Sequence, residues 1–202
     1  LPYKVFGAFK FFERKEIKDV LGYVKVLLNP RDSVSVKRIL NIPGRKIGKT
    51  SLDTIEDAAI AQWISLYEAM QSIDTIDVPS AARNGVMQFM SIFAEIQSQW
   101  STLSSADVIS TILKLTKYKE YLIKEEWNDS AAEEKYDNIG QLINMAGRYS
   151  EYGEDSLRQF MEEVTLLADA ADNSDENAEA IKLMTTHSSK WLEFPFVFLV
   201  GL

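Results

Sequence analysis

Apolar residues recur at three- and four-residue spacing along most of the chain, which is the pattern of helices that bury one face. The spacing predicts helices around residues 17–28, 34–40, 52–60, 79–100, 104–115, 131–150 and 155–170. Ser104 and Asp107 have the spacing of a capping box, with Asp in place of Glu, which predicts a helix start there. We therefore expect a mainly α fold, arranged as a helix bundle.

Short strands are predicted only near the two ends of the chain, at residues 3–6, 181–185 and 196–200. The last run is apolar without alternation, which is typical of a parallel strand buried on both faces. Two or three such strands cannot form a covered sheet by themselves. Because the chain also begins at Leu1 without methionine and stops inside this apolar run, we interpret it as a helical domain with the edges of a neighbouring α/β domain, cut from a longer polypeptide.

The composition excludes several classes of site. With no cysteine and one histidine, the chain has no disulfide, zinc ribbon or thiol nucleophile, and no His-rich metal site. Paired carboxylates are not convincingly placed for acid/base chemistry, so we expect neither catalytic nor metal-binding residues. The longest apolar run is too short to span a bilayer and no signal peptide precedes it, which predicts a soluble, cytoplasmic protein without a membrane partner.

Charge is distributed unevenly along the sequence. Residues 1–50 contain twelve Lys/Arg and four acidic residues, whereas residues 51–202 contain ten basic and 26 acidic residues. A basic segment attached to an acidic body favours contact with a polyanion such as nucleic acid. Lysine-rich surface helices are the alternative explanation.

Residues 44–50, Gly-Arg-Lys-Ile-Gly-Lys-Thr, are the best candidate for a phosphate contact. A nucleotide-binding P-loop needs four residues between its glycines and a preceding strand, but here there are three residues and a predicted helix. A hairpin between two helices instead exposes the amides of the second helix's first turn, which can hold a backbone phosphate. Arg45, Lys46 and Lys49 would add charge, Gly48 would allow close approach, and Thr50 would cap or donate.

Two other functions stay open on the residues alone. The chain could be a helical protein-interaction module that does not bind nucleic acid, or a small nucleotide kinase that uses residues 44–50. Trp63, Trp100 and Trp127 lie in helical segments, and we expect them in the core rather than as base-stacking platforms.

Three segments resemble the UvrD/PcrA/Rep-type superfamily 1 DNA helicases. Residues 3–19 look like the segment just after motif IV of that family. Residues 41–48 resemble its Asn-x-Pro-x-Arg-Gly-Ile-Gly stretch, and residues 183–195 resemble its motif V, Leu-Met-Thr-x-His-Ser-Ala-Lys-Gly-Leu-Glu-Phe. The matches occur in family order and bracket the whole chain.

The resemblance implies a domain organisation and a parent activity. Residues 1–14 would be the edge of RecA-like domain 2A, 15–178 the helical 2B accessory subdomain, and 179–202 the return into 2A. The parent would be an ATP-dependent 3′–5′ DNA helicase of replication or repair that uses ATP and Mg. This chain would need no cofactor of its own and would be inactive alone, with DNA and the missing RecA-like domains as partners.

The resemblance also implies site residues. It assigns duplex DNA contact to the hairpin, namely Arg45, Lys46, Ile47, Gly48, Lys49 and Thr50. In motif V, Thr185 and His187 would face the DNA backbone, while Lys190 and Glu193 would face the nucleotide. The sequence departs from the family where Lys46 replaces the first glycine of Gly-Ile-Gly and Trp191 replaces the motif V glycine.

Overall fold

The computed structural model describes residues 3–5, 8–99, 102–172, 181–183 and 194–200. The chain divides into two compact units, one formed by Arg14–Glu162 and the other by Leu1–Glu13 with Glu163–Leu202. The first unit contains the site described below. The domain boundaries implied by the resemblance stay a prediction.

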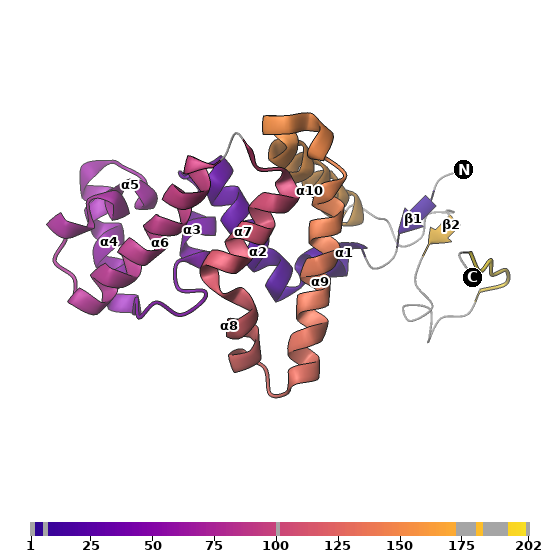
Figure 1. Cartoon of the computed structure of the whole chain (residues 1–202), viewed down its shortest axis with the longest axis horizontal. Coiled ribbons are helices and arrows are strands. Elements are labelled where there is room, and N and C mark those ends of the chain that lie inside the picture. Colours follow the sequence, from indigo (N-terminus) through magenta and orange to yellow (C-terminus); the bar gives the residue numbers. More distant parts are fainter. Residues whose placement is uncertain (1–2, 6–7, 100–101, 173–180, 184–193, 201–202) are drawn as a thin grey trace. The chain divides into compact units, whose positions relative to one another are not determined.

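Helices account for most of the described residues, which confirms the mainly α prediction (Figure 1). In chain order they are α1 (Ala8–Glu13), α2 (Lys15–Leu28), α3 (Ser33–Ile39), α4 (Lys49–Gln62), α5 (Leu66–Gln71), α6 (Ser80–Ser98), α7 (Ser105–Thr116), α8 (Tyr118–Glu125), α9 (Asp129–Gly147) and α10 (Ser156–Asp172). Short 3₁₀ turns occur at η1 (Ile73–Thr75) and η3 (Ser150–Asp155). The strands β1 (Tyr3–Val5) and β2 (Ile181–Leu183) pair in parallel, with Tyr3 opposite Ile181.

Helix α2 is the central element of the Arg14–Glu162 unit. It packs against α3, α7 and α9, and most of its residues are buried. Next to it lies an aromatic cluster in which the Tyr23 ring stacks on Phe93, with centroids 6.0 Å apart, and Phe93 meets Phe89 at 4.8 Å. Tyr67 of α5 meets Phe93 edge-on. The cluster joins α2, α5 and α6, the scaffold on which the α3–α4 hairpin sits.

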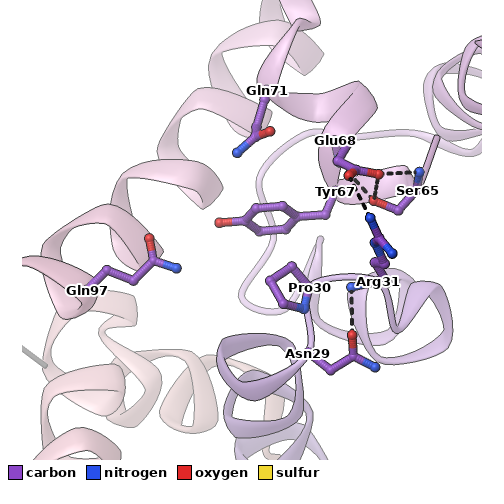
Figure 2. Close-up of a pocket in the computed structure, with 8 residues that line it drawn as sticks. All are labelled: Asn29, Pro30, Arg31, Ser65, Tyr67, Glu68, Gln71 and Gln97. Atoms are coloured by element: carbon purple, nitrogen blue, oxygen red, sulfur yellow. Dashed lines mark hydrogen bonds and ion pairs between the residues drawn. The ribbon is translucent and has the colours of Figure 1, made fainter.

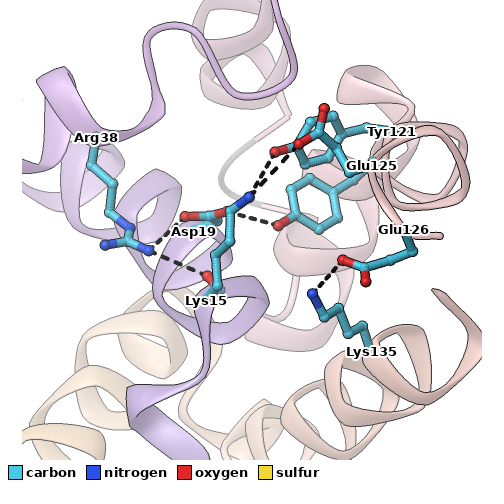
Figure 3. Close-up of polar contacts among 8 residues, drawn as sticks. Lys15, Asp19, Arg38, Tyr121, Glu125, Glu126 and Lys135 are labelled. Carbon is cyan, nitrogen blue, oxygen red and sulfur yellow. Dashed lines mark hydrogen bonds and ion pairs between the residues drawn. The ribbon is translucent and has the colours of Figure 1, made fainter. Parts of the chain in front are cut away.

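A buried polar contact fixes α3 and α8 to α2 (Figure 3). The fully buried carboxylate of Asp19 pairs with Arg38 at 2.7 Å and accepts a hydrogen bond from the Tyr118 hydroxyl at 2.9 Å. Burial, reinforced by the Asp19 charge, raises the pKa of Tyr118 well above its usual value. Because removing one partner would leave a buried group uncompensated, this contact specifies how these helices pack.

The structure confirms the predicted helices and the Ser104–Asp107 capping box, in which each side chain accepts from the other residue's amide. Three short helices, α1, α5 and α8, are absent from the prediction. The predicted strand at residues 196–200 is wrong, since the structure assigns no strand to those residues and leaves them exposed.

The prediction that the tryptophans lie in the core is wrong for both of those that the structure describes. Trp63 is 96% exposed and Trp127 is 88% exposed, while Trp100 lies outside the described residues. Trp63 is the residue that ends α4, and its left-handed backbone, with φ of 55°, takes the chain off the helix at that point. Helical spacing therefore did not place its side chain on the buried face.

Candidate nucleic-acid interface

The candidate site is the hairpin between α3 and α4, residues 40–48. Asn41 organises it, because its side-chain oxygen accepts hydrogen bonds from the backbone amides of Arg45 (2.6 Å) and Ile47 (3.4 Å). Between these two residues, Lys46 adopts a left-handed conformation with φ of 60°. Glycine adopts this conformation without steric cost, so the family's glycine at this position has a conformational reason.

The sequence predicts an exposed Arg45 that contacts phosphate, but the structure buries this side chain. Only 6% of it is exposed. Its Nη1 lies 2.9–3.2 Å from four carbonyl oxygens, those of Ile39 at the end of α3 and of Leu40, Ile42 and Pro43 in the hairpin. Its Nη2 donates to the Tyr23 hydroxyl at 2.6 Å, and its guanidinium lies over the Phe89 ring. A planar cation with several donors suits this role. Arg45 therefore holds the hairpin from inside, and its side chain is not a surface phosphate contact.

Ile47 is likewise buried, with 5% exposure, and packs where α6 approaches the hairpin most closely. At that point α6 has Gly85, whose Cα is so near the hairpin that an added Cβ would lie 2.2 Å from the Arg45 carbonyl oxygen and 3.0 Å from Ile47 Cγ1. Glycine at position 85 therefore allows the hairpin backbone to lie directly on the helix.

Burial also changes the chemistry of the tyrosine beneath the hairpin. The Tyr23 hydroxyl donates to the Ile42 carbonyl and accepts from Arg45. Burial raises the pKa of Tyr23 to about 12, although the Arg45 charge acts in the opposite direction. The hydroxyl stays protonated at neutral pH and keeps both hydrogen bonds.

The outer side of the hairpin has the features of an anion site. Gly44, Lys46, Gly48, Lys49 and Thr50 are all exposed. Gly48 precedes α4 as its N-cap residue; no side chain caps this helix end, and its first turn has no acidic residue. The first amides of α4, at the positive end of the helix dipole, therefore point to open solvent beside two lysines.

Gly48 has no structural need to be glycine. Its φ is −75°, which any residue can adopt, and an added Cβ would meet no atom within 4 Å. The missing side chain instead leaves the amides at the start of α4 uncovered, which is what close approach of a phosphate requires.

The motif V residues Thr185, His187, Lys190 and Glu193 lie outside the described residues, as does Trp191. In the part of the chain that the structure describes, no three His, Asp or Glu side chains come together as a metal site. Within the same part, no helix has the length and apolar character needed to cross a membrane.

The comparison with known families identifies the chain. The model of the UvrD-like helicase C-terminal domain matches residues 1–202. The chain belongs to the UvrD-like helicases. The ATP-dependent DNA helicase PcrA of Bacillus subtilis (strain 168) is 36% identical over 208 residues, and the protein of the same name from Staphylococcus aureus (strain Mu50) is 31% identical over 205. All of this chain is covered in both comparisons, and it spans 28% of the length of each relative.

Three residues position this UvrD-like hairpin, and the sequence did not predict this role for any of them: Tyr23, Asn41 and Gly85. Asn41 had a weak signal, since asparagine side chains at turns often bond nearby backbone amides. Gly85 had one too, because glycine inside a long apolar helix pattern indicates close packing or a kink. Tyr23 had no such signal, because its pairing with the hairpin depends on the tertiary fold.

Proposed function

We propose that this chain is the duplex-contacting 2B region of an ATP-dependent 3′–5′ DNA helicase, and that the outer side of the α3–α4 hairpin holds the DNA backbone. Lys46 and Lys49 supply the charge, and the uncapped amides after Gly48 supply directed donors. The single observation that carries the proposal is Gly48, a glycine required neither by its backbone nor by its packing.

The buried residues of the hairpin have a different role in this proposal. Arg45 and Ile47 fix its shape from below, so that the exposed backbone is presented as a rigid loop. A loop held in its binding conformation loses little conformational entropy when it meets DNA. Binding through backbone phosphates carries no sequence information, which suits a protein that must move along DNA of any sequence.

The parent helicase would use ATP and Mg to translocate on single-stranded DNA in replication or repair. Thr185 and His187 would contact the DNA strand, while Lys190 and Glu193 would contact the nucleotide, as the motif V resemblance implies. The RecA-like domains that complete the ATPase would be the other partners. The 202-residue chain alone would not hydrolyse ATP, and ATPase activity of the purified chain that is stimulated by DNA would contradict this.

Salt-dependent DNA binding tests the proposal. A fluorescently labelled duplex with a single-stranded tail is titrated with the chain, and the affinity is measured by anisotropy at several salt concentrations. Lys49→Glu should weaken binding about tenfold or more and lower the salt slope, because a phosphate contact becomes a repulsion. Lys114→Glu makes the same charge change at an exposed position on α7 and is the matched control. Equal loss in both variants would show that only net charge matters and would refute a hairpin site.

A further inference from the structure

A groove between α5, η1 and α6 lies on the same unit as the hairpin and is not used by the proposed DNA contact. It consists of two adjoining pockets of about 420 and 430 Å³. Both are lined by Tyr67, Gln71 and Gln97. We call the combined feature the α5–α6 groove.

One half of the groove is apolar and deformable. Its lining includes three methionines, Met70, Met87 and Met90, together with Ala94. Met87 is 51% exposed and lies on the open side of α6, a helix that buries its other face. Methionine surfaces adapt to apolar side chains of different shapes, which is why they recur at peptide-binding surfaces.

The other half offers free hydrogen-bonding groups (Figure 2). The Tyr67 ring projects into the pocket, with its hydroxyl between the side chains of Gln71 and Gln97. Among the described residues this hydroxyl has no hydrogen-bond partner, and it is not one of the fully buried unpaired atoms, so it is open to the pocket even though only 6% of Tyr67 as a whole is exposed. Two amides and a hydroxyl at one place can pair with the N–H and C=O groups of a protein backbone.

The charge around the groove selects the ligand. Residues 51–99, which contain α4, α5 and α6, have seven acidic residues and a single basic one, Arg83, and the loop before α3 adds Arg31 to the groove lining. Within the groove itself, the Asp74 side chain is 78% exposed and is held by a long ion pair of 3.7 Å to Arg83. Glu68 lies 3.7 Å from Arg31 and also accepts hydrogen bonds from the Ser65 amide and hydroxyl. Such exposed pairs contribute little and are readily exchanged for an incoming cation. The exposed Asp74 carboxylate would therefore attract an incoming Lys or Arg.

We propose that the α5–α6 groove is a docking site for a protein segment in which an apolar side chain is flanked by Lys or Arg. The apolar side chain enters the methionine-lined half, the segment's backbone pairs with Gln71, Gln97 and the Tyr67 hydroxyl, and its basic residue pairs with Asp74. The site is independent of the DNA contact, because the two lie on different elements.

Peptide selection on the full chain tests this proposal. A random peptide library displayed on phage is selected against the chain, and the best peptide is synthesised with a fluorescent label for anisotropy. We expect enriched sequences to contain Leu, Met or Phe next to Lys or Arg. Ala94→Tyr fills the methionine-lined half without changing charge and should weaken the peptide about tenfold. Asp74→Asn should weaken it several-fold.

Asp57→Asn, which makes the same charge change on an exposed position of α4 outside the groove, is the matched control and should leave peptide affinity unchanged. Circular dichroism would show that each variant is folded, and duplex DNA affinity should be the same in all of them. The proposal is overturned by enrichment of acidic peptides or of none, by equal peptide affinity of Ala94→Tyr and the parent chain, or by competition between duplex DNA and the selected peptide. Failure of the hairpin proposal would leave these outcomes unaffected.

Discussion

Replacing Gly85 by alanine tests whether the hairpin is held by direct backbone contact with α6. The added Cβ would lie 2.2 Å from the Arg45 carbonyl oxygen, and since real contacts of this kind begin near 3 Å, the hairpin must retreat by about 1 Å. Helix propensity alone would favour alanine by about 1 kcal/mol. Overpacking against backbone costs about 1–3 kcal/mol, and it displaces the Arg45 hydrogen bonds as well. We expect net destabilisation of about 1–2 kcal/mol, which combines these two effects.

Gly140→Ala is the matched control for this prediction. Gly140 lies inside α9, and an added Cβ there meets no atom within 4 Å, so only the propensity gain of about 0.5–1 kcal/mol remains. Thermal unfolding, followed by far-UV circular dichroism, measures both effects. We expect Tm to fall by about 3–6 °C in Gly85→Ala and to rise by about 1–4 °C in Gly140→Ala. Duplex affinity should fall only in the first variant. A rise in Tm for both variants would refute the close contact between α6 and the hairpin.

Four further changes separate the inner and outer roles of the hairpin. Arg45→Lys should lower the free energy of unfolding by about 1–3 kcal/mol in urea titrations, because an ammonium cannot serve the same spread of acceptors. Lys46→Gly should raise Tm, since it removes about 1 kcal/mol of left-handed strain, yet weaken duplex binding and reduce its salt slope by about one. Gly48→Ala should change stability by only about 0.5 kcal/mol but weaken duplex binding measurably by anisotropy. Because the folded pKa of Tyr23 is raised to about 12, its stabilisation is present below pH 10 and lost as pH rises from 10 to 12, so Tyr23→Phe should flatten the alkaline decline seen in urea titrations.

Sequence reasoning predicted the helices well where the signal is local. The apolar spacing of α2 and the Ser104–Asp107 capping box depend on residues within a turn or two of each other, so the sequence alone carries them. Helix α5 has only six residues, too few for a periodic pattern, although Ser65 and Glu68 form a complete capping box that marks its start.

The direction of the hairpin side chains could not be predicted in the same way. Periodicity does not apply inside a tight turn, so nothing nearby in the sequence says that Arg45 faces inward and Lys46 outward. The deciding contacts are with Tyr23, 22 residues earlier, and with Gly85 on α6. This is why the sequence predicts that Arg45, a charged residue in a basic segment, contacts DNA. In the structure its partners are the protein's own carbonyl groups.

The central claim is that the exposed backbone from Gly44 to Thr50 holds the DNA. Backbone amide chemical shifts, recorded by NMR while the labelled chain is titrated with a short duplex, report on that backbone directly. We expect the largest changes at Gly48, Lys49 and Thr50, with smaller ones at Gly44 and Lys46 and none along the α5–α6 groove. Largest changes elsewhere, with the amides at the start of α4 unmoved at saturating duplex, would contradict the account.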